Sequence, residues 1–146
     1  MLASCGGNVT SPTGPLNPGS LSAEYLNGNG FISSSARVSD QSNVFIVSAT
    51  QDLDISGAVA NEITLSIPTN STLPYSVNAQ NGAIVTFYDV TLDKTFEANS
   101  AQGDCAIIVT QISPTFEGTF SATTICSTAP DTVSKLTNGA FNATYQ

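Results

Sequence analysis

Short runs of β-branched and aromatic residues, separated by turn-forming pairs, constrain the fold of this chain more than any other feature. From Gly30 onward the runs recur without a sustained 3.6-residue period. Turn signals that favour positive φ interrupt them at Asn27-Gly28, Asn81-Gly82, Gln102-Gly103-Asp104 and Asn138-Gly139. Regularly spaced short strands are typical of sandwiches and barrels. We therefore predict an all-β domain, a single antiparallel β-sandwich or flattened barrel with a flexible N-terminal arm.

The apolar runs also place the individual strands. We expect them at residues 31–38, 43–50, 63–67, 75–78, 83–91, 95–98, 105–113, 116–126, 132–136 and 140–145. Residues 20–26 form the one possible helix, which is too short to be stable alone.

Length and charge limit the classes of function. A chain of 146 residues is one domain's worth of sequence. Its net charge of -8 repels phosphate backbones, which argues against nucleic-acid binding. The sequence contains no histidine, so Ser-His-Asp, Cys-His and His-metal sites cannot form within the chain. We expect no cofactor and no enzymatic activity.

The N-terminal residues predict a lipid anchor. Leu2-Ala3-Ser4-Cys5 resembles a bacterial lipobox, in which the cysteine is diacylated and becomes the first residue after cleavage. Residues 6–22 form a Gly/Pro/Ser/Thr tract of low hydrophobicity, typical of a tether. We therefore expect a lipobox remnant and tether at residues 1–22, a β-sandwich domain at residues 23–146, and a membrane as partner through Cys5. The alternative is that Cys5 is a thiol without a lipid.

The remaining cysteines, Cys105 and Cys126, predict a structural disulfide. A tight turn between Thr115 and Phe116 would place Val109 opposite Ala122 and the two cysteines opposite each other. A metal or catalytic thiol is the alternative, although two cysteines without histidine make a poor metal site.

Several segments together resemble small, uncharacterised lipoproteins of the Bacteroidota. They are Tyr-Leu-Asn-Gly-Asn-Gly-Phe at residues 25–31, the segment around Tyr75, Glu-Gly-Thr-Phe-Ser at residues 117–121 and Leu-Thr-Asn-Gly-Ala-Phe at residues 136–141. The resemblance implies a lipid-anchored β-domain outside the cytoplasm, attached to the outer membrane and either periplasmic or on the cell surface. It supplies no catalytic residues. The chain departs from surface-exported members in having no charge directly after Cys5.

Other residues are candidates for weaker sites. Asp52 and Asp54 offer oxygen ligands for calcium in an extracellular loop. Tyr75 and Tyr88 are candidates for stacking against sugar rings. Asp131-Thr132-Val133 resembles an O-glycosylation motif of the Bacteroidota, with Thr132 as acceptor.

The sequence as a whole favours a non-enzymatic, lipid-anchored envelope or cell-surface β-domain with a binding or structural role. One alternative is a subunit of an extracellular filament or sheath that self-associates through its N-terminal arm, since edge strands with few charges pair readily. The other is a glycan-binding module.

Overall fold

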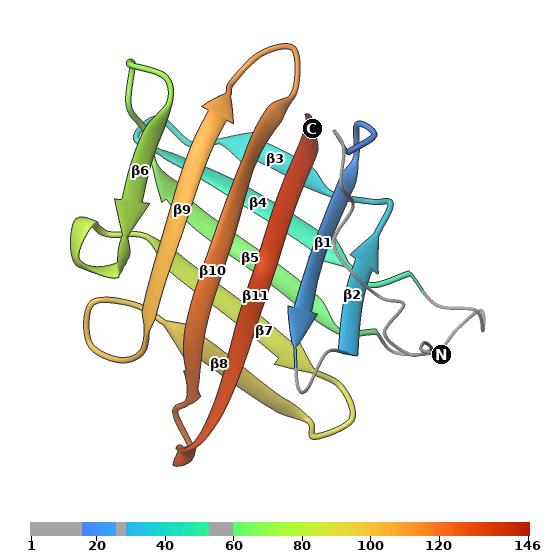
Figure 1. Cartoon of the computed structure of the whole chain (residues 1–146), viewed down its shortest axis with the longest axis vertical. Coiled ribbons are helices and arrows are strands. Elements are labelled where there is room, and N and C mark those ends of the chain that lie inside the picture. The colour runs from blue at the N-terminus through green and yellow to red at the C-terminus, as the bar shows by residue number, and fades with distance from the viewer. Residues whose placement is uncertain (1–15, 26–28, 53–59) are drawn as a thin grey trace, which may run out of the picture.

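A computed structural model describes residues 16–25, 29–52 and 60–146, which form a nearly all-β fold of two facing layers (Figure 1). The front layer contains, in spatial order, β6 (Tyr75–Asn78), β9 (Asp104–Gln111), β10 (Phe116–Cys126), β11 (Ala129–Tyr145), β1 (Ser20–Tyr25) and β2 (Asn29–Ser33). The back layer contains β3 (Arg37–Asp40), β4 (Val44–Thr50), β5 (Glu62–Pro68), β7 (Ile84–Asp89) and β8 (Lys94–Ala98). The predicted all-β sandwich or flattened barrel is confirmed.

The two layers belong to one 11-stranded sheet, because strand pairing continues around two corners. At one corner the end of β10 pairs with β8 through Ile125 and Cys126. At the other, the end of β11 pairs with β3 through Thr144 and Tyr145. This second pairing is parallel, so the sheet is mixed and not purely antiparallel as predicted. The N-terminal half of β11 pairs only within the front layer, and its last residues reach the back layer.

The core lies between the layers and is built from alternate residues of each strand. β9 illustrates the period of two: Cys105, Ile107 and Val109 are buried, and the residues between them are exposed. Rings fill the centre, where Phe116 lies between Phe45 and Phe141 with centroid distances of 4.5 and 5.6 Å. Fully burying a phenylalanine stabilises a fold by about 1.5–3 kcal/mol, so these rings contribute a large share of the apolar stabilisation.

Two expected strand boundaries were wrong. The expected strand at residues 31–38 is divided between β2 and β3, because the chain bends after Ser33 and the Ala36 N–H donates to the carbonyl of Gly19. The two expected closing strands are joined in β11. Asn138 has the positive φ that we predicted, 51°, but it forms a bulge within the strand and not a hairpin turn.

The β-domain begins earlier than we predicted. β1 covers Ser20–Tyr25, where we expected the end of a tether and a possible short helix. The segment just before it is also held, since the Gly19 N–H donates to the carbonyl of Asn142 at 2.7 Å. Pairing with β11 on one side and β2 on the other makes residues 20–25 a strand despite their weak intrinsic pattern. Residues 1–15 of the predicted arm lie outside the described residues.

The predicted disulfide between Cys105 and Cys126 is absent, and both thiols are free. The predicted register of the β9–β10 hairpin was wrong, because Cys105 lies opposite Ala122 and Val109 lies opposite Gly118. The turn is centred earlier in the chain than we assumed, and the pairing shifts again between Glu117 and Gly118. Cys126 is therefore four residues further along β10, about 13 Å away at ~3.3 Å per residue, beyond the reach of a disulfide.

A buried polar network closes one end of the sandwich. The Asn61 side chain donates to the Tyr25 hydroxyl at 2.9 Å and to the Gln51 side-chain oxygen at 2.7 Å. Its own oxygen accepts the Val90 N–H at 2.8 Å. Burial raises the pKa of Tyr25, and the nearby Asp89 adds to this shift. The network therefore joins four residues from separate parts of the chain.

Candidate binding surface

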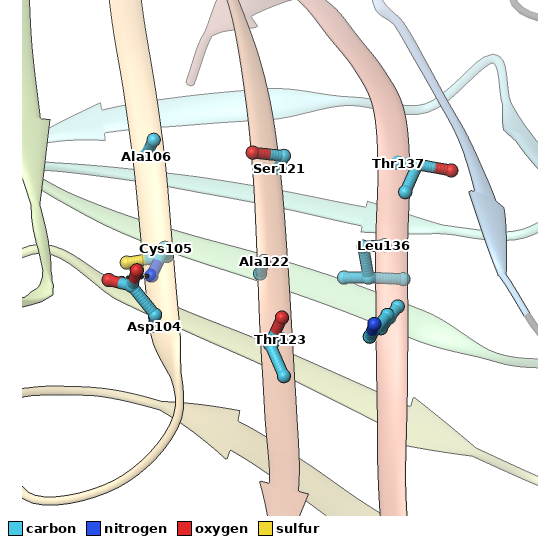
Figure 2. Close-up of a pocket in the computed structure, with 9 residues that line it drawn as sticks. Asp104, Cys105, Ala106, Ser121, Ala122, Thr123, Leu136 and Thr137 are labelled. Atoms are coloured by element: carbon cyan, nitrogen blue, oxygen red, sulfur yellow. Dashed lines mark hydrogen bonds between the residues drawn. The ribbon is translucent and has the colours of Figure 1, made fainter.

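A shallow trough follows the strands across the outer face of β9, β10 and β11. It consists of three adjoining hollows of about 230, 390 and 170 Å³, which share lining residues. The first hollow contains Ala106, Ser121 and Thr137, which lie side by side on three neighbouring strands (Figure 2). We refer to the three hollows together as the trough.

The floor of the trough is uncharged, and the charged residues lie at its ends. Ala106, Thr119 and Ala140 line the central hollow together with Ile108, which is 44% exposed. Asp104 and Lys135 lie in the hollow at one end. Glu117 lies at the other end, where its carboxylate accepts hydrogen bonds from the side chains of Gln111 and Thr115 at 3.0 and 3.1 Å. The trough therefore suits an uncharged ligand along most of its length.

Two glycines in β10 and β11 leave room for phenylalanine rings beneath the trough. Gly118 lies opposite Phe141, and Gly139 lies opposite Phe120, in two cross-strand pairs of β10 and β11. A Cβ atom on Gly118 would lie 2.6 Å from the Phe141 ring, and one on Gly139 would lie 2.6 Å from the Phe120 ring. The phenylalanine rings thus occupy the space that side chains at these two positions would need.

The bulge of β11 shapes one wall of the trough. The register of β11 shifts against both β10 and β1 near Thr137 and Asn138. Asn138 lines the central hollow, and its side chain donates to the Glu24 carboxylate at 2.7 Å. A bulge redirects a side chain in this way without ending the strand.

Asn142 carries an unsatisfied polar atom at one end of the trough. This residue lines the hollow, is 5% exposed, and donates from Nδ2 to the carbonyl of Leu16 at 2.8 Å. Its Oδ1 atom is buried and has no hydrogen-bond partner among the described residues. The buried Ser22 Oγ has no partner either, and Ser22 lies opposite Ala140 in the β1–β11 ladder. A buried polar atom without a partner costs about 1–3 kcal/mol, which a ligand bearing the complementary group would recover.

The two described cysteines lie in different environments. Burial raises the pKa of the Cys105 thiol to about 11, with a smaller contribution from Asp104. A hydrogen bond with Thr128 lowers the pKa of Cys126. Cys105 lines the first hollow but is only 3% exposed, so its thiol belongs to the core and not to the surface of the trough.

The predicted calcium ligands are only partly described. One carboxylate oxygen of Asp52 accepts the Ser34 N–H at 3.1 Å, directly after the end of β2. Asp54 lies outside the described residues. Among residues 16–25, 29–52 and 60–146, no three or more His, Cys, Asp or Glu side chains gather to hold a metal ion.

The two predicted glycan-binding tyrosines do not form a common platform. Tyr75 is 7% exposed, so its ring is part of the core and is unavailable for stacking against a sugar. Tyr88 lies partly exposed in β7 and donates its hydroxyl to Asp93 at 2.9 Å, and this hydrogen bond raises the pKa of Tyr88.

The other predicted site residues are Thr132 and Cys5. Thr132 is half-buried in β11, beside the exposed Asp131 and Val133. Cys5 lies outside the described residues. In the described part of the chain no helix is long and apolar enough to cross a membrane.

Sequence reasoning missed the trough because its residues look unremarkable one at a time. The available signal lay in the residues of each strand that alternate with the core residues and face outward. Small residues such as Ala106, Ser121 and Ala140 recur at these positions in three strands. Asn142 gave no signal, since only the structure shows that its amide is buried.

An all-β sandwich whose outer face carries a trough with an uncharged floor defines this chain as a domain with a candidate binding surface. Residues 20–144 match a family described as a domain of unknown function, DUF6252, and the chain belongs to this family. No curated protein and no solved structure matches the chain significantly.

Proposed function

We propose that this chain is a non-enzymatic, lipid-anchored β-domain of the bacterial envelope or cell surface, and that its trough binds an extended polypeptide. The observation that supports this proposal best is Asn142. Asn142 lines the end hollow, and its buried Oδ1 has no hydrogen-bond partner among the described residues, so it is suited to accept a hydrogen bond from a ligand.

Asn142 favours a polypeptide as ligand over other classes. A side-chain amide has the same donor and acceptor as a peptide bond, so one asparagine can bind both polar groups of an extended backbone. Its Nδ2 already donates to a backbone carbonyl, that of Leu16. Small side chains on the floor allow a backbone to approach closely. Because the trough floor is uncharged and the net charge of -8 repels acidic partners, we expect an uncharged segment.

Selection of peptides tests this binding function. A library of displayed random peptides is panned against the full chain, and we expect enrichment of uncharged sequences without a helical pattern. Ser121→Arg, which places a long charged side chain at the boundary of two hollows, should reduce their binding at least tenfold. Thr95→Arg, at an exposed position of β8, is the matched control and should retain binding. Failure to enrich any peptide, or binding that Ser121→Arg does not change, would refute the proposal.

The lipid anchor rests on the sequence around Cys5. Acylation there would place the domain on a membrane surface, with the following residues as spacer. The test is the intact mass of the protein from its native cell. We expect a chain that lacks residues 1–4 and carries acyl groups, and that becomes unmodified in Cys5→Ala. An unmodified wild-type chain would exclude the anchor and leave the binding proposal standing.

A second candidate function is glycan binding at Tyr88. Its partly exposed ring and the adjacent Asp93 carboxylate are groups that sugar-binding sites use. Tyr88→Ala should abolish retention on immobilised polysaccharide if this function is correct, whereas Ser121→Arg should not affect it. Retention that survives Tyr88→Ala would exclude this candidate.

A further inference from the structure

We infer that the end hollow of the trough, which Glu117 and Asn142 line, binds the free N-terminal ammonium group of the partner polypeptide. This inference rests on the proposed binding function, because it identifies one end of the bound polypeptide and the direction in which it lies in the trough.

Two hydrogen-bond acceptors lie opposite each other at this end of the trough. Glu117 of β10 and Asn142 of β11 are directly opposed in the β10–β11 ladder, and both line the same hollow. Directly opposed side chains have Cβ atoms about 4.5–5.5 Å apart. A single ammonium group can therefore donate to both side chains, at about 2.7–2.9 Å from the carboxylate oxygen.

Each of the two side chains has an oxygen available. The side chains of Gln111 and Thr115 both donate to Oε1 of Glu117, and no described residue donates to its Oε2. Asn142 is 5% exposed, and its Oδ1 has no hydrogen-bond partner among the described residues. The Leu16 carbonyl accepts from Nδ2 of the same amide, which fixes the amide plane. An ammonium group has three donors and no acceptor, so it suits a site that offers oxygens only.

The carboxylate of Glu117 has no cationic partner in the described part of the chain. Lys135 lies at the opposite end of the trough, six residue steps of β10 away, or about 20 Å at ~3.3 Å per residue. Arg37 donates to the Thr144 hydroxyl at 2.9 Å, and Lys94 belongs to β8 in the other layer. These are the three cationic side chains of the sequence. A cation from the ligand would supply the missing countercharge, and the net charge of -8 attracts it.

A chain terminus fits this hollow better than a lysine side chain does. The hollow is the smallest of the three, at about 170 Å³. An N-terminal ammonium group is attached directly to Cα, whereas lysine carries its ammonium group on a flexible four-carbon stem that needs further room. The opposite end of the trough contains both Asp104 and Lys135, so it does not select one terminal charge. The polypeptide therefore runs from Glu117 towards Thr123, parallel to β10, with its uncharged side chains along the floor.

Acetylation of a bound peptide tests the inference. The peptide most enriched from random heptapeptides displayed with free N termini is synthesised with a free and with an acetylated N terminus, and each form is titrated calorimetrically against the full chain. Acetylation removes the positive charge, so we expect it to weaken binding at least about tenfold. Glu117→Gln should weaken binding of the free form to a similar extent and leave the acetylated form within about twofold, which also shows that the variant is folded. Glu62→Gln, which removes the same charge from an exposed position of β5, is the matched control and should keep the full preference for the free form.

Three results of this titration would overturn the inference. The first is equal affinity of the two forms, and the second is a preference for the free form that persists in Glu117→Gln. The third is an acetylated peptide that keeps its affinity but loses it when a lysine is replaced, because a side chain would then supply the ammonium group. In each case the proposed function stands if Ser121→Arg still reduces binding. If no peptide is enriched, the function and the inference fail together.

A nitroxide at the C terminus of the same peptide tests its direction. Seven extended residues span roughly 23 Å, so the label should reach the far end of the trough. In the isotope-labelled chain we expect the greatest loss of amide signal at Asp104, Thr123 and Lys135, which line that end. The greatest loss near Glu117 and Asn142 would mean that the peptide lies in the opposite direction and would overturn the inference.

Discussion

Replacing Gly118 by alanine should destabilise the fold more than its size suggests. An added Cβ would lie 2.1 Å from the Ile108 carbonyl oxygen and 2.6 Å from the Phe141 ring. Overpacking typically costs about 1–3 kcal/mol, and we expect the upper end, about 3 kcal/mol, because the backbone oxygen belongs to the β9–β10 ladder and has little freedom to move. At ~2–4 °C per kcal/mol for a chain of this size, the melting temperature should fall by roughly 6–12 °C.

Urea unfolding followed by circular dichroism measures this effect. Ser121→Ala is the matched control, since it lies in the same strand at an exposed position and should stay within about 0.5 kcal/mol of the wild type. The two variants differ in what the new side chain contacts, so the difference between their free energies of unfolding measures the effect of packing beneath the trough. A Gly118→Ala variant as stable as Ser121→Ala would refute the close approach of β9, β10 and Phe141.

Three further predictions concern polar groups. Asn61→Ala should cost about 2–4 kcal/mol in urea unfolding, because the half-buried Tyr25 hydroxyl loses one hydrogen bond and the Val90 N–H loses its partner; a loss below 1 kcal/mol would contradict the network. The raised pKa of Cys105, about 11 against an ordinary 9.0, means that the folded state holds its proton more tightly than the unfolded state. The contribution of this thiol to the free energy of unfolding should therefore be fully present below pH 9 and be lost as the pH rises to about 11. The free energy of unfolding of Cys105→Ala should decline less over that range; equal slopes for the two proteins would contradict this prediction. Asn142→Leu should change stability by less than about 1 kcal/mol, since the lost hydrogen bond offsets removal of a buried unpaired oxygen, and should abolish binding of selected peptides; peptide binding retained by this variant would argue against the role of Asn142.

The all-β class could be predicted because it depends on local information. Period-two alternation in segments such as Cys105–Val109 survives in the structure as alternating buried and exposed side chains. Positive φ at Gly82 and Gly103 was likewise predictable from turn chemistry. These features depend on residues close together in the chain, so neither needed knowledge of the tertiary contacts.

Register and long-range pairing could not be predicted, because they depend on partners far apart in sequence. The predicted alignment of Cys105 with Cys126 required a tight turn directly before Phe116, and a small error at the turn moved the cysteines four residues apart. β1 became a strand through pairing with β11, more than a hundred residues later. The trough requires both kinds of information, since it forms only when β9, β10 and β11 are aligned.

The trough and the core beneath it depend on the same residues. Phe141 lies opposite Gly118, and Phe120 lies opposite Gly139, so the rings that fill the core are packed against the positions where no side chain is present. A substitution at either glycine therefore acts on the core, whereas a substitution at Ser121 acts on the outer surface alone. If the trough is a binding surface, Ser121→Arg should separate binding from stability, which no substitution at the two glycines can do. Loss of stability in Ser121→Arg comparable to that in Gly118→Ala would mean that the outer face is held by packing and would argue against a ligand there.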